Sequence, residues 1–321
     1  MASGKAQILK DAKLGLIGYG AQGRAEALNL RRSGIPFELG LRPQGPSWNR
    51  ALEDGFHPKS LEKVAEDSMS LALNIPDQDQ ANFYRDHLRR KHPKRLIFAH
   101  GFNTHFKLIP LENEGPSHLL VAPKGAASGL IEFYAGPSAL PAILAVENSK
   151  ELEADKTFAE VYAAAIGCHP KGLIWATFKD ETECDLFSEQ VLLCGGVTSL
   201  LRRSYEVLTE AGYNSETAYF ETLFELKLIV DLLWREGISG MRAKISPTAR
   251  YGDITRGDRV IDASVKARMK EVLSEIQSGE FAKEFLSGIS SETFRTLEKN
   301  QSGHPIEKIG AELRSRLRDH G

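Results

Sequence analysis

Apolar and polar positions divide the chain into two regions with different periodicity. Before residue 180, short apolar runs alternate with turns and helical patterns, at residues 14–17, 35–42, 70–76, 95–101, 118–125, 141–148 and 172–178. After residue 181 the pattern is helical, with breaks at Gly195–Gly196, Gly212 and Gly237. Short apolar runs separated by helices predict a mostly parallel sheet. We therefore expect an α/β domain at residues 1–180 and an all-α domain at residues 181–321.

A glycine-rich turn follows the first apolar run and precedes a helical pattern. Gly18, Gly20 and Gly23 have G-x-G-x-x-G spacing, in the strand-to-helix context that a dinucleotide fingerprint requires. Such glycines allow a tight turn, approach of a pyrophosphate to the helix N-terminus, and close helix packing. The alternative is an ordinary glycine-rich turn. We expect a Rossmann-type domain in which the cofactor contacts Gly18, Tyr19, Gly20, Ala21, Gln22 and Gly23.

The end of the second predicted strand indicates which cofactor is bound. An NAD site usually has Asp or Glu there, to bind the ribose hydroxyls, whereas this strand ends at Arg42 and its Glu38 comes too early. Arg42 with Ser47 nearby suits a 2′-phosphate, and hence NADP. The alternative is that Arg42 is a solvated surface residue.

An apolar helix predicted at residues 216–234, ETAYFETLFELKLIVDLLW, carries two acidic side chains. Asn214 or Ser215 can cap its start, and Gly237 ends it. Glu221 and Glu225 are four residues apart and therefore lie on one face. The same face continues with Leu228, Ile229 and Leu232. We therefore expect both carboxylates to share a face with core residues.

A second segment, ETECDLFSEQVLLCGG, repeats this arrangement with Asp185 and Glu189. Unpaired buried carboxylates are costly, so two such pairs need a cation, a partner or water. Mg²⁺ prefers oxygen ligands, and four converging carboxylates suit two ions. The alternative is a solvated pair at a helix end, where acidic residues are favoured. Spacing alone leaves both interpretations open.

Composition and charge exclude several classes of protein. The chain has 321 residues, a net charge of -2 and no long basic run, so we expect two domains and no nucleic-acid partner. Three cysteines without a CxxC pair indicate reduced thiols and a cytoplasmic location. The N-terminus has no apolar signal core, and no uninterrupted apolar stretch approaches membrane-spanning length.

Together these motifs resemble ketol-acid reductoisomerase (acetohydroxy-acid isomeroreductase), in its short-chain form. The resemblance extends from about residue 14 to residue 317. It is carried by IGYGAQGRAEALNLRRSG, FAHGFN, VAPKG, TFKDETECDLFSEQVLLCGG, TEAGYNSETAYFETLFELKLIVDL, GISGMR followed by IS, and HPIEKIGAEL. It implies that two Mg²⁺ ions hold 2-acetolactate or 2-aceto-2-hydroxybutanoate. An alkyl group then migrates and NADPH reduces the product to a 2,3-dihydroxy acid, in valine and isoleucine synthesis.

The resemblance also implies metal-binding and proton-transfer roles for the four carboxylates. By similarity, Asp185 bridges both ions and Glu189 binds one of them. Glu221 belongs to the shell of the second ion. Glu225 belongs to the metal site and manages the proton of the substrate hydroxyl.

Further roles carried over by resemblance concern the substrate and the cofactor. Ser246 would hold the substrate carboxylate. His100 and Lys124, each of which taken alone is more typical of a loop residue, would act catalytically, and Gly125 would contact the cofactor. In the family the helical domain is knotted and two subunits build each site, which implies a homodimer or a larger assembly of dimers.

The chain departs from the family pattern at four places near these residues. One is residues 246–250, which read SPTAR where Ser-Asn-Thr-Ala-Glu is more usual. After Gly125 it reads AASGLIEFYAGPSALP, where a Pro-Gly-His-like stretch is common. Arg24 and Glu26 stand where histidines are common. Residues 43–46 are PQGP, where the family often has another serine, so use of NADH is possible beside NADPH.

Two other functions compete with this interpretation. The chain could be another NADP-dependent hydroxyacid or imine dehydrogenase of similar plan, which would need no metal and would leave the four carboxylates unexplained. It could instead be a catalytically silent NADP-binding homologue, which the loop differences allow and the intact acidic set argues against.

Overall fold

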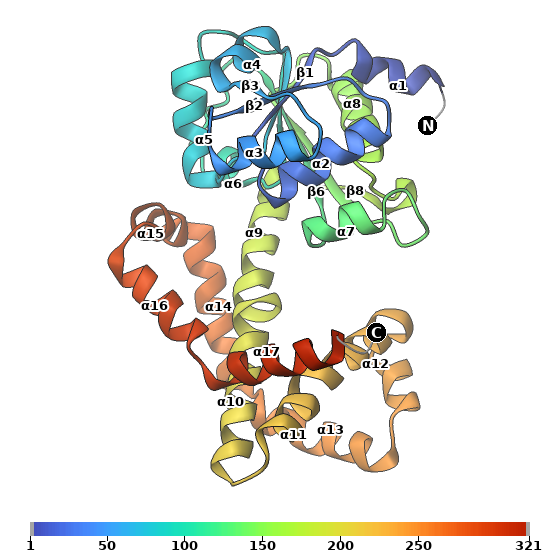
Figure 1. Cartoon of the computed structure of the whole chain (residues 1–321), viewed down its shortest axis with the longest axis vertical. Coiled ribbons are helices and arrows are strands. Elements are labelled where there is room, and N and C mark those ends of the chain that lie inside the picture. Colours follow the sequence, from blue (N-terminus) through green and yellow to red (C-terminus); the bar gives the residue numbers. More distant parts are fainter. Residues whose placement is uncertain (1–2, 319–321) are drawn as a thin grey trace. The chain divides into compact units, whose positions relative to one another are not determined.

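The computed structural model describes residues 3–318, and its internal contacts divide the chain into two units, Met1–Cys184 and Asp185–Gly321. The division falls inside helix α9 (Phe178–Ser188). The first unit is α/β and the second is helical (Figure 1), which confirms the two fold classes expected from the sequence.

An eight-stranded sheet forms the centre of the first unit, in the order β3-β2-β1-β4-β5-β6-β7-β8. All neighbouring strands are parallel except β6 and β7. The strands are β1 (Leu14–Ile17), β2 (Glu38–Leu41), β3 (Lys59–Ser60), β4 (Ser70–Leu73), β5 (Arg95–Phe98), β6 (Ser117–Pro123), β7 (Ala142–Glu147) and β8 (Leu173–Trp175). Every apolar run singled out in the sequence overlaps one of these strands, whereas the two-residue β3 has no such signal.

Helices cover both faces of this sheet (Figure 1), so each central strand is buried on two sides. One face packs against α1 (Ser3–Lys10), α2 (Ala21–Arg32), α3 (Pro46–Glu53), α7 (Ala127–Glu132) and α8 (Leu152–Ala165). The other face packs against α4 (Leu61–Asp67), α5 (Asp77–Phe83), the π-helix η1 (Tyr84–Leu88) and the start of α9. The short helices α6 (Phe102–His105) and η2 (Pro170–Gly172) lie in connections. Strand order reverses at β1, which creates the crevice where ligands bind in such sheets.

The second unit contains helices only, within the residues that the structure describes. They are η3 (Glu189–Leu193), α10 (Gly195–Glu210), α11 (Ser215–Tyr219), η4 (Phe220–Phe224), α12 (Glu225–Lys244), α13 (Pro247–Val260), α14 (Ala263–Ser278), α15 (Glu280–Gly288), α16 (Glu292–Ser302) and α17 (Pro305–Arg318). A small core joins α10, α11 and α17 through Tyr205, Tyr219, Ile306 and Leu313. The last helix therefore packs on its own chain.

Much of the apolar surface of the second unit is exposed. Leu228, expected in the core, is 51% exposed. Other large apolar side chains in the same condition include Leu192, Leu193, Val207, Trp234 and Ile238. The expectation that Glu221 and Glu225 share a face with residues buried in this chain is therefore wrong for Leu228. Helical periodicity identifies an apolar face but not what covers it.

Both acidic segments contain a π-helical turn that the sequence did not reveal. The turn η3 begins at Glu189, and η4 lies between Tyr219 and Glu225. Asn214 caps α11 by accepting from the backbone N–H groups of Glu216 and Thr217, as expected. Gly237 has a φ of 69° and interrupts α12, although helical turns continue to Lys244. Turns of the π type occur frequently at functional sites.

A buried ion pair ties β5 to α8. The Nε of Arg95 donates to Oδ1 of Asp155 at 2.6 Å, and the Ser149 hydroxyl donates to Oδ2 at 2.6 Å. The two charged side chains are only 9% and 1% exposed. Lys94, which precedes β5, forms an exposed ion pair with Glu151, the N-cap of α8, at 2.7 Å.

These two ion pairs should differ sharply in their contribution to stability. Asp155→Ala leaves a buried guanidinium without its partner and should lower the free energy of unfolding by about 3–5 kcal/mol. Glu151→Ala removes a solvated pair and should cost less than about 1 kcal/mol. Urea denaturation of both variants measures the difference, and equal losses would contradict the assignment of Asp155 as a core interaction.

Candidate active site

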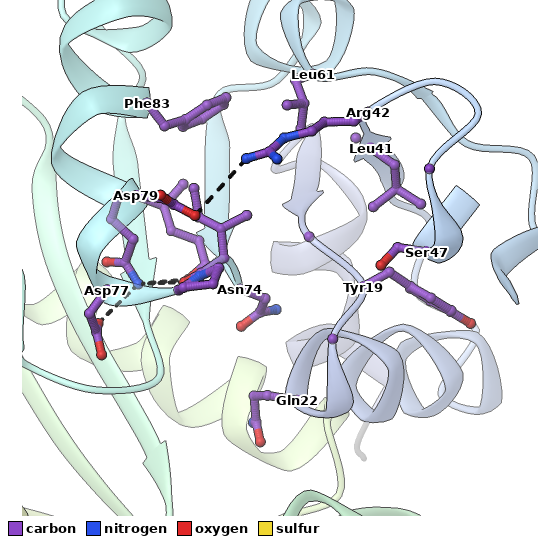
Figure 2. A pocket seen from close by; sticks show the side chains of 18 of the residues that line it. Tyr19, Gln22, Leu41, Arg42, Ser47, Leu61, Asn74, Asp77, Asp79 and Phe83 are labelled. Carbon is purple, nitrogen blue, oxygen red and sulfur yellow. Dashed lines mark hydrogen bonds and ion pairs between the residues drawn. The ribbon is translucent and has the colours of Figure 1, made fainter. Parts of the chain in front are cut away.

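A cavity of about 760 Å³ opens at the carboxyl ends of β1, β2 and β4. Most of the cofactor residues expected from the sequence line it (Figure 2): Gly18, Tyr19, Gly20, Ala21, Gln22, Arg42 and Ser47. His100 also lines this cavity, whereas Gly23 and Gly125 do not. The fingerprint turn, the end of β2 and the end of β5 are therefore brought to one space.

The backbone explains why the fingerprint needs glycine. Gly18 has a φ of +103°, and a Cβ there would lie 2.3 Å from the carbonyl oxygen of Asn74. A Cβ at Gly23 would lie 2.4 Å from the carbonyl oxygen of Gly18, so this residue serves helix packing. A Cβ at Gly20 would meet no atom within 4 Å. Gly20 is the N-cap of α2 and offers no side-chain cap, so the first N–H groups of this helix are open to an anionic ligand.

A buried carboxylate lies beneath this turn. Glu26 is 2% exposed and accepts hydrogen bonds from Gln22 Nε2 at 2.9 Å, Asn74 Nδ2 at 2.8 Å and the Tyr162 hydroxyl at 2.7 Å. Burial raises the pKa of Glu26, and these three donors only partly oppose that shift. Gln22 and Asn74 both line the cavity, so Glu26 connects the cavity wall to the core.

A second polar cluster supports Tyr19. The Tyr19 hydroxyl donates to Asp54 Oδ2 at 2.9 Å, and Arg24 binds the same carboxylate at 2.7 and 2.9 Å. Hydrogen bonding from Arg24 lowers the pKa of Asp54 to about 2, and burial raises the pKa of Tyr19. Asp54 is the C-cap of α3, so Arg24 joins the fingerprint helix to the segment that follows Arg42.

Glu181 forms the polar centre of the neighbouring site, and sequence analysis missed it. Its side chain is 1% exposed and accepts from Lys124 Nζ at 2.7 Å and from the backbone N–H of Gly101 at 2.9 Å. His100 Nδ1 lies 3.3 Å from the carboxylate. Burial opposes ionisation, but His100 and Lys124 outweigh it and lower the pKa of Glu181. The available signal was its position four residues before Asp185.

Close packing fixes α9 against the end of β5. A Cβ at Gly101 would lie 2.3 Å from Oγ1 of Thr182, so only glycine permits this approach. His105 lies beside the next acidic residue of the helix, with Nε2 3.4 Å from Glu183. Burial lowers the pKa of His105. The rotation of α9, and hence the direction of Glu181, is thereby set by α6 and the turn before it.

Asp185 follows Glu181 by one turn of the same continuous helix. One ligand atom from each of His100, Glu181 and Asp185 lies within 4.8 Å of the others, so these three side chains could hold a metal ion. Within residues 3–318, no such group of three or more brings Glu189, Glu221 or Glu225 to Asp185. Of the four metal-binding carboxylates expected from the sequence, this group of described residues therefore contains only Asp185.

The remaining predicted residues are not members of this group. Glu189, Glu221 and Glu225 are exposed, and Ser246 caps α13 by accepting from the Ala249 N–H at 3.1 Å. Gly125 has a φ of +154° and packs against Leu140.

The divergent segment after Gly125 is anchored on α2. Asn29 donates from Nδ2 to the carbonyl oxygens of Leu130 and Ile166, at 2.7 Å each. The Ser33 hydroxyl lies 2.6 Å from that of Tyr134.

The fold and the cavity define a nicotinamide-nucleotide-dependent oxidoreductase: a doubly wound sheet, a glycine fingerprint at the helix N-terminus, and polar side chains at neighbouring strand ends. Residues 8–172 match the family model "Acetohydroxy acid isomeroreductase, NADPH-binding domain", and residues 178–319 match "Ketol-acid reductoisomerase, C-terminal domain". The chain belongs to the ketol-acid reductoisomerase family, whose activity in branched-chain amino-acid biosynthesis it therefore shares.

Solved structures agree with this membership. The chain is similar to an NADH-preferring ketol-acid reductoisomerase from an uncultured archean, with 37% identity, 97% of this chain and 96% of that chain covered, and a TM-score of 0.89. A semialdehyde dehydrogenase NAD-binding protein from Cupriavidus necator shares only the fold, with 14% identity, 84% and 99% coverage, and a TM-score of 0.62. A pyrroline carboxylate reductase from Plasmodium falciparum also shares only the fold. It has 12% identity, 84% of this chain and 98% of that chain are covered, and the TM-score is 0.52.

The raised pKa of Glu26 predicts a specific pH dependence of stability. As pH rises above the ordinary carboxyl value of 4.5, the unfolded chain loses this proton before the folded chain does, so stability falls. Glu26→Gln keeps the shape and removes this titration, and should flatten the fall in unfolding free energy. Denaturation at a series of pH values measures it, with the exposed Glu132→Gln as control. Identical profiles for Glu26→Gln and wild type would show that Glu26 titrates normally.

Proposed function

We propose that the chain converts 2-acetolactate and 2-aceto-2-hydroxybutanoate into 2,3-dihydroxy-3-methyl acids with Mg²⁺ and a reduced nicotinamide cofactor. The observation that supports this most directly is the arrangement around Glu181. The Glu181 carboxylate contacts His100, which lines the dinucleotide cavity. Asp185 lies one turn further along the same helix. Cofactor and metal chemistry would thus meet at one place.

At the cofactor end, the cavity accommodates a dinucleotide whose pyrophosphate lies at the start of α2. Arg42 and Ser47 would contact the adenosine ribose, at the far side of the fingerprint from β5. The nicotinamide would then lie toward His100, which Glu181 holds in place. Because Lys124 is engaged by the same carboxylate, both side chains would reach the substrate from fixed positions.

At the metal end, Asp185 and Glu189 would hold two ions together with Glu221 and Glu225. Bound Mg²⁺ would supply Lewis-acid polarisation of the substrate carbonyl and would stabilise negative charge on the substrate oxygens during alkyl migration. Glu225 would take and return the proton of the substrate hydroxyl, and Ser246 would bind the substrate carboxylate. The apolar residues around these carboxylates would exclude water and strengthen their electrostatic interactions.

We further infer that two subunits complete each site. Two observations support this. Among the described residues, Glu221 and Glu225 are not in the group of possible metal ligands that contains Asp185. Large apolar side chains of the helical unit are also exposed. The helical run Phe178–Glu210 is long and apolar enough to cross a membrane by length and composition. It contains Asp185 and Glu189, and a buried subunit interface explains its apolar surface equally well. We therefore propose that the protein is a cytoplasmic homodimer or an assembly of dimers, with a knotted helical domain.

Loss of the Asp185 carboxylate should abolish turnover without unfolding the protein. Asp185→Asn removes one negative charge from the metal site and should reduce activity with 2-acetolactate by at least about 10²-fold. The matched control is Asp180→Asn, which removes a charge from an exposed position in the first turn of the same helix. Steady-state rates, Mg²⁺ binding by calorimetry and melting temperatures are measured together. Near-normal activity of Asp185→Asn at saturating Mg²⁺ would contradict a metal-binding role for Asp185.

The two chemical steps should respond differently to a change at Glu225. Isomerisation requires removal of the substrate hydroxyl proton, whereas reduction of the rearranged ketone 3-hydroxy-3-methyl-2-oxobutanoate depends on it less. Glu225→Gln should therefore lose about 10²- to 10⁴-fold on 2-acetolactate and much less on the ketone. Rates on both substrates decide this at saturating Mg²⁺ and cofactor. Equal losses would assign Glu225 to metal binding or site assembly.

A further inference from the structure

An acidic side chain faces Arg42 across the cofactor cavity. Nη2 of Arg42 lies 4.0 Å from Oδ2 of Asp79, and both residues line the cavity (Figure 2). Arg42 follows β2, whereas Asp79 lies in the first turn of α5, on the opposite wall. The sequence has no acidic residue at the end of β2, and the fold supplies one from a different element.

Asp79 differs from the other acidic residues near it. The carboxylate of Asp77 accepts from Gln80 and Asn103, and thus points away from Arg42. Asp86 also lines the cavity, but its carboxylate binds the adjacent Arg85 at 2.9 Å. Asp79 is the carboxylate that approaches Arg42, and the side chains of the two residues are 43% and 79% exposed. This pair is solvated and loose, so a ligand can separate it.

We propose that Asp79 is a specificity-determining residue that shifts the preference of the cavity from NADPH toward NADH. This inference rests on the proposed position of the adenosine ribose at Arg42. A 2′-phosphate carries a charge of about -1.5 to -2 at pH 7 and would have to displace Asp79 from Arg42 while lying close to it. A free 2′-hydroxyl can instead donate a hydrogen bond to the carboxylate, as it does to the acidic residue of ordinary NAD sites.

The size of the effect follows from the charges. Repulsion between one carboxylate and a doubly charged phosphate across a few ångströms of solvated cleft corresponds to roughly a five- to tenfold loss of affinity. Because both groups are exposed to solvent, added salt should reduce the discrimination. Arg42 attracts the phosphate, so the two residues have opposite effects on NADPH.

The test measures the dissociation constants of NADPH and NADH by nucleotide fluorescence, using the full chain without substrate. Asp79→Asn should bind NADPH roughly five- to tenfold more tightly, and NADH unchanged or more weakly. The gain should shrink at high salt. Asp86→Asn removes the same charge from the same cavity beside Arg85 and should leave the ratio unchanged. Melting temperatures confirm that each variant is folded.

Two results would overturn the inference. One is an equal change in both dissociation constants for Asp79→Asn, and the other is the same gain in NADPH affinity for Asp86→Asn. Arg42→Ala distinguishes failure of this inference from failure of the proposed cofactor position. If Arg42 contacts the 2′-phosphate, this variant should weaken the binding of NADPH alone, whatever the role of Asp79. A wild-type chain that binds neither nucleotide would overturn both.

Discussion

The site depends on one buried carboxylate. Glu181 is removed from water, and it is held by a lysine from the end of β6, a histidine from the end of β5 and the backbone N–H of Gly101. A buried carboxylate is stable only when its oxygens are satisfied in this way. These contacts fix the start of α9 against two strand ends of the sheet. They therefore orient His100 toward the dinucleotide cavity and place Asp185 one helical turn away, at the beginning of the acidic set.

The cofactor cavity is supported in the same way, by buried polar groups below the fingerprint turn. Glu26 ties Gln22 and Asn74 to Tyr162 in the core, and Asp54 ties Tyr19 to Arg24. Glu26 and Arg24 are two of the positions at which the chain departs from the family pattern. Each has its own partners within the first unit, so these departures are locally compensated. Satisfied polar networks of this kind specify one arrangement of the residues they join.

Sequence patterns predicted the strands other than β3, the fingerprint and the capping of α11, because each depends on residues close in the chain. Periodicity could not predict that Glu181 is the central carboxylate, since its partners come from β5 and β6 far away in sequence. It could not place Asp79 opposite Arg42 for the same reason. The π-turns at both acidic pairs also leave no periodic signal. Leu228 shows a related limit, because an apolar helix face is visible in the sequence while the surface that covers it is not.

We propose that the cofactor cavity and the carboxylates of the helical unit serve one metal-dependent reaction. Oxidation of NADPH and of NADH with 2-acetolactate, measured with and without Mg²⁺, tests this proposal. The oxidation should require Mg²⁺, stop on addition of a chelator and yield the 2,3-dihydroxy acid. Oxidation at an unchanged rate without metal, or binding of the cofactor without any turnover at saturating Mg²⁺, would contradict the proposal.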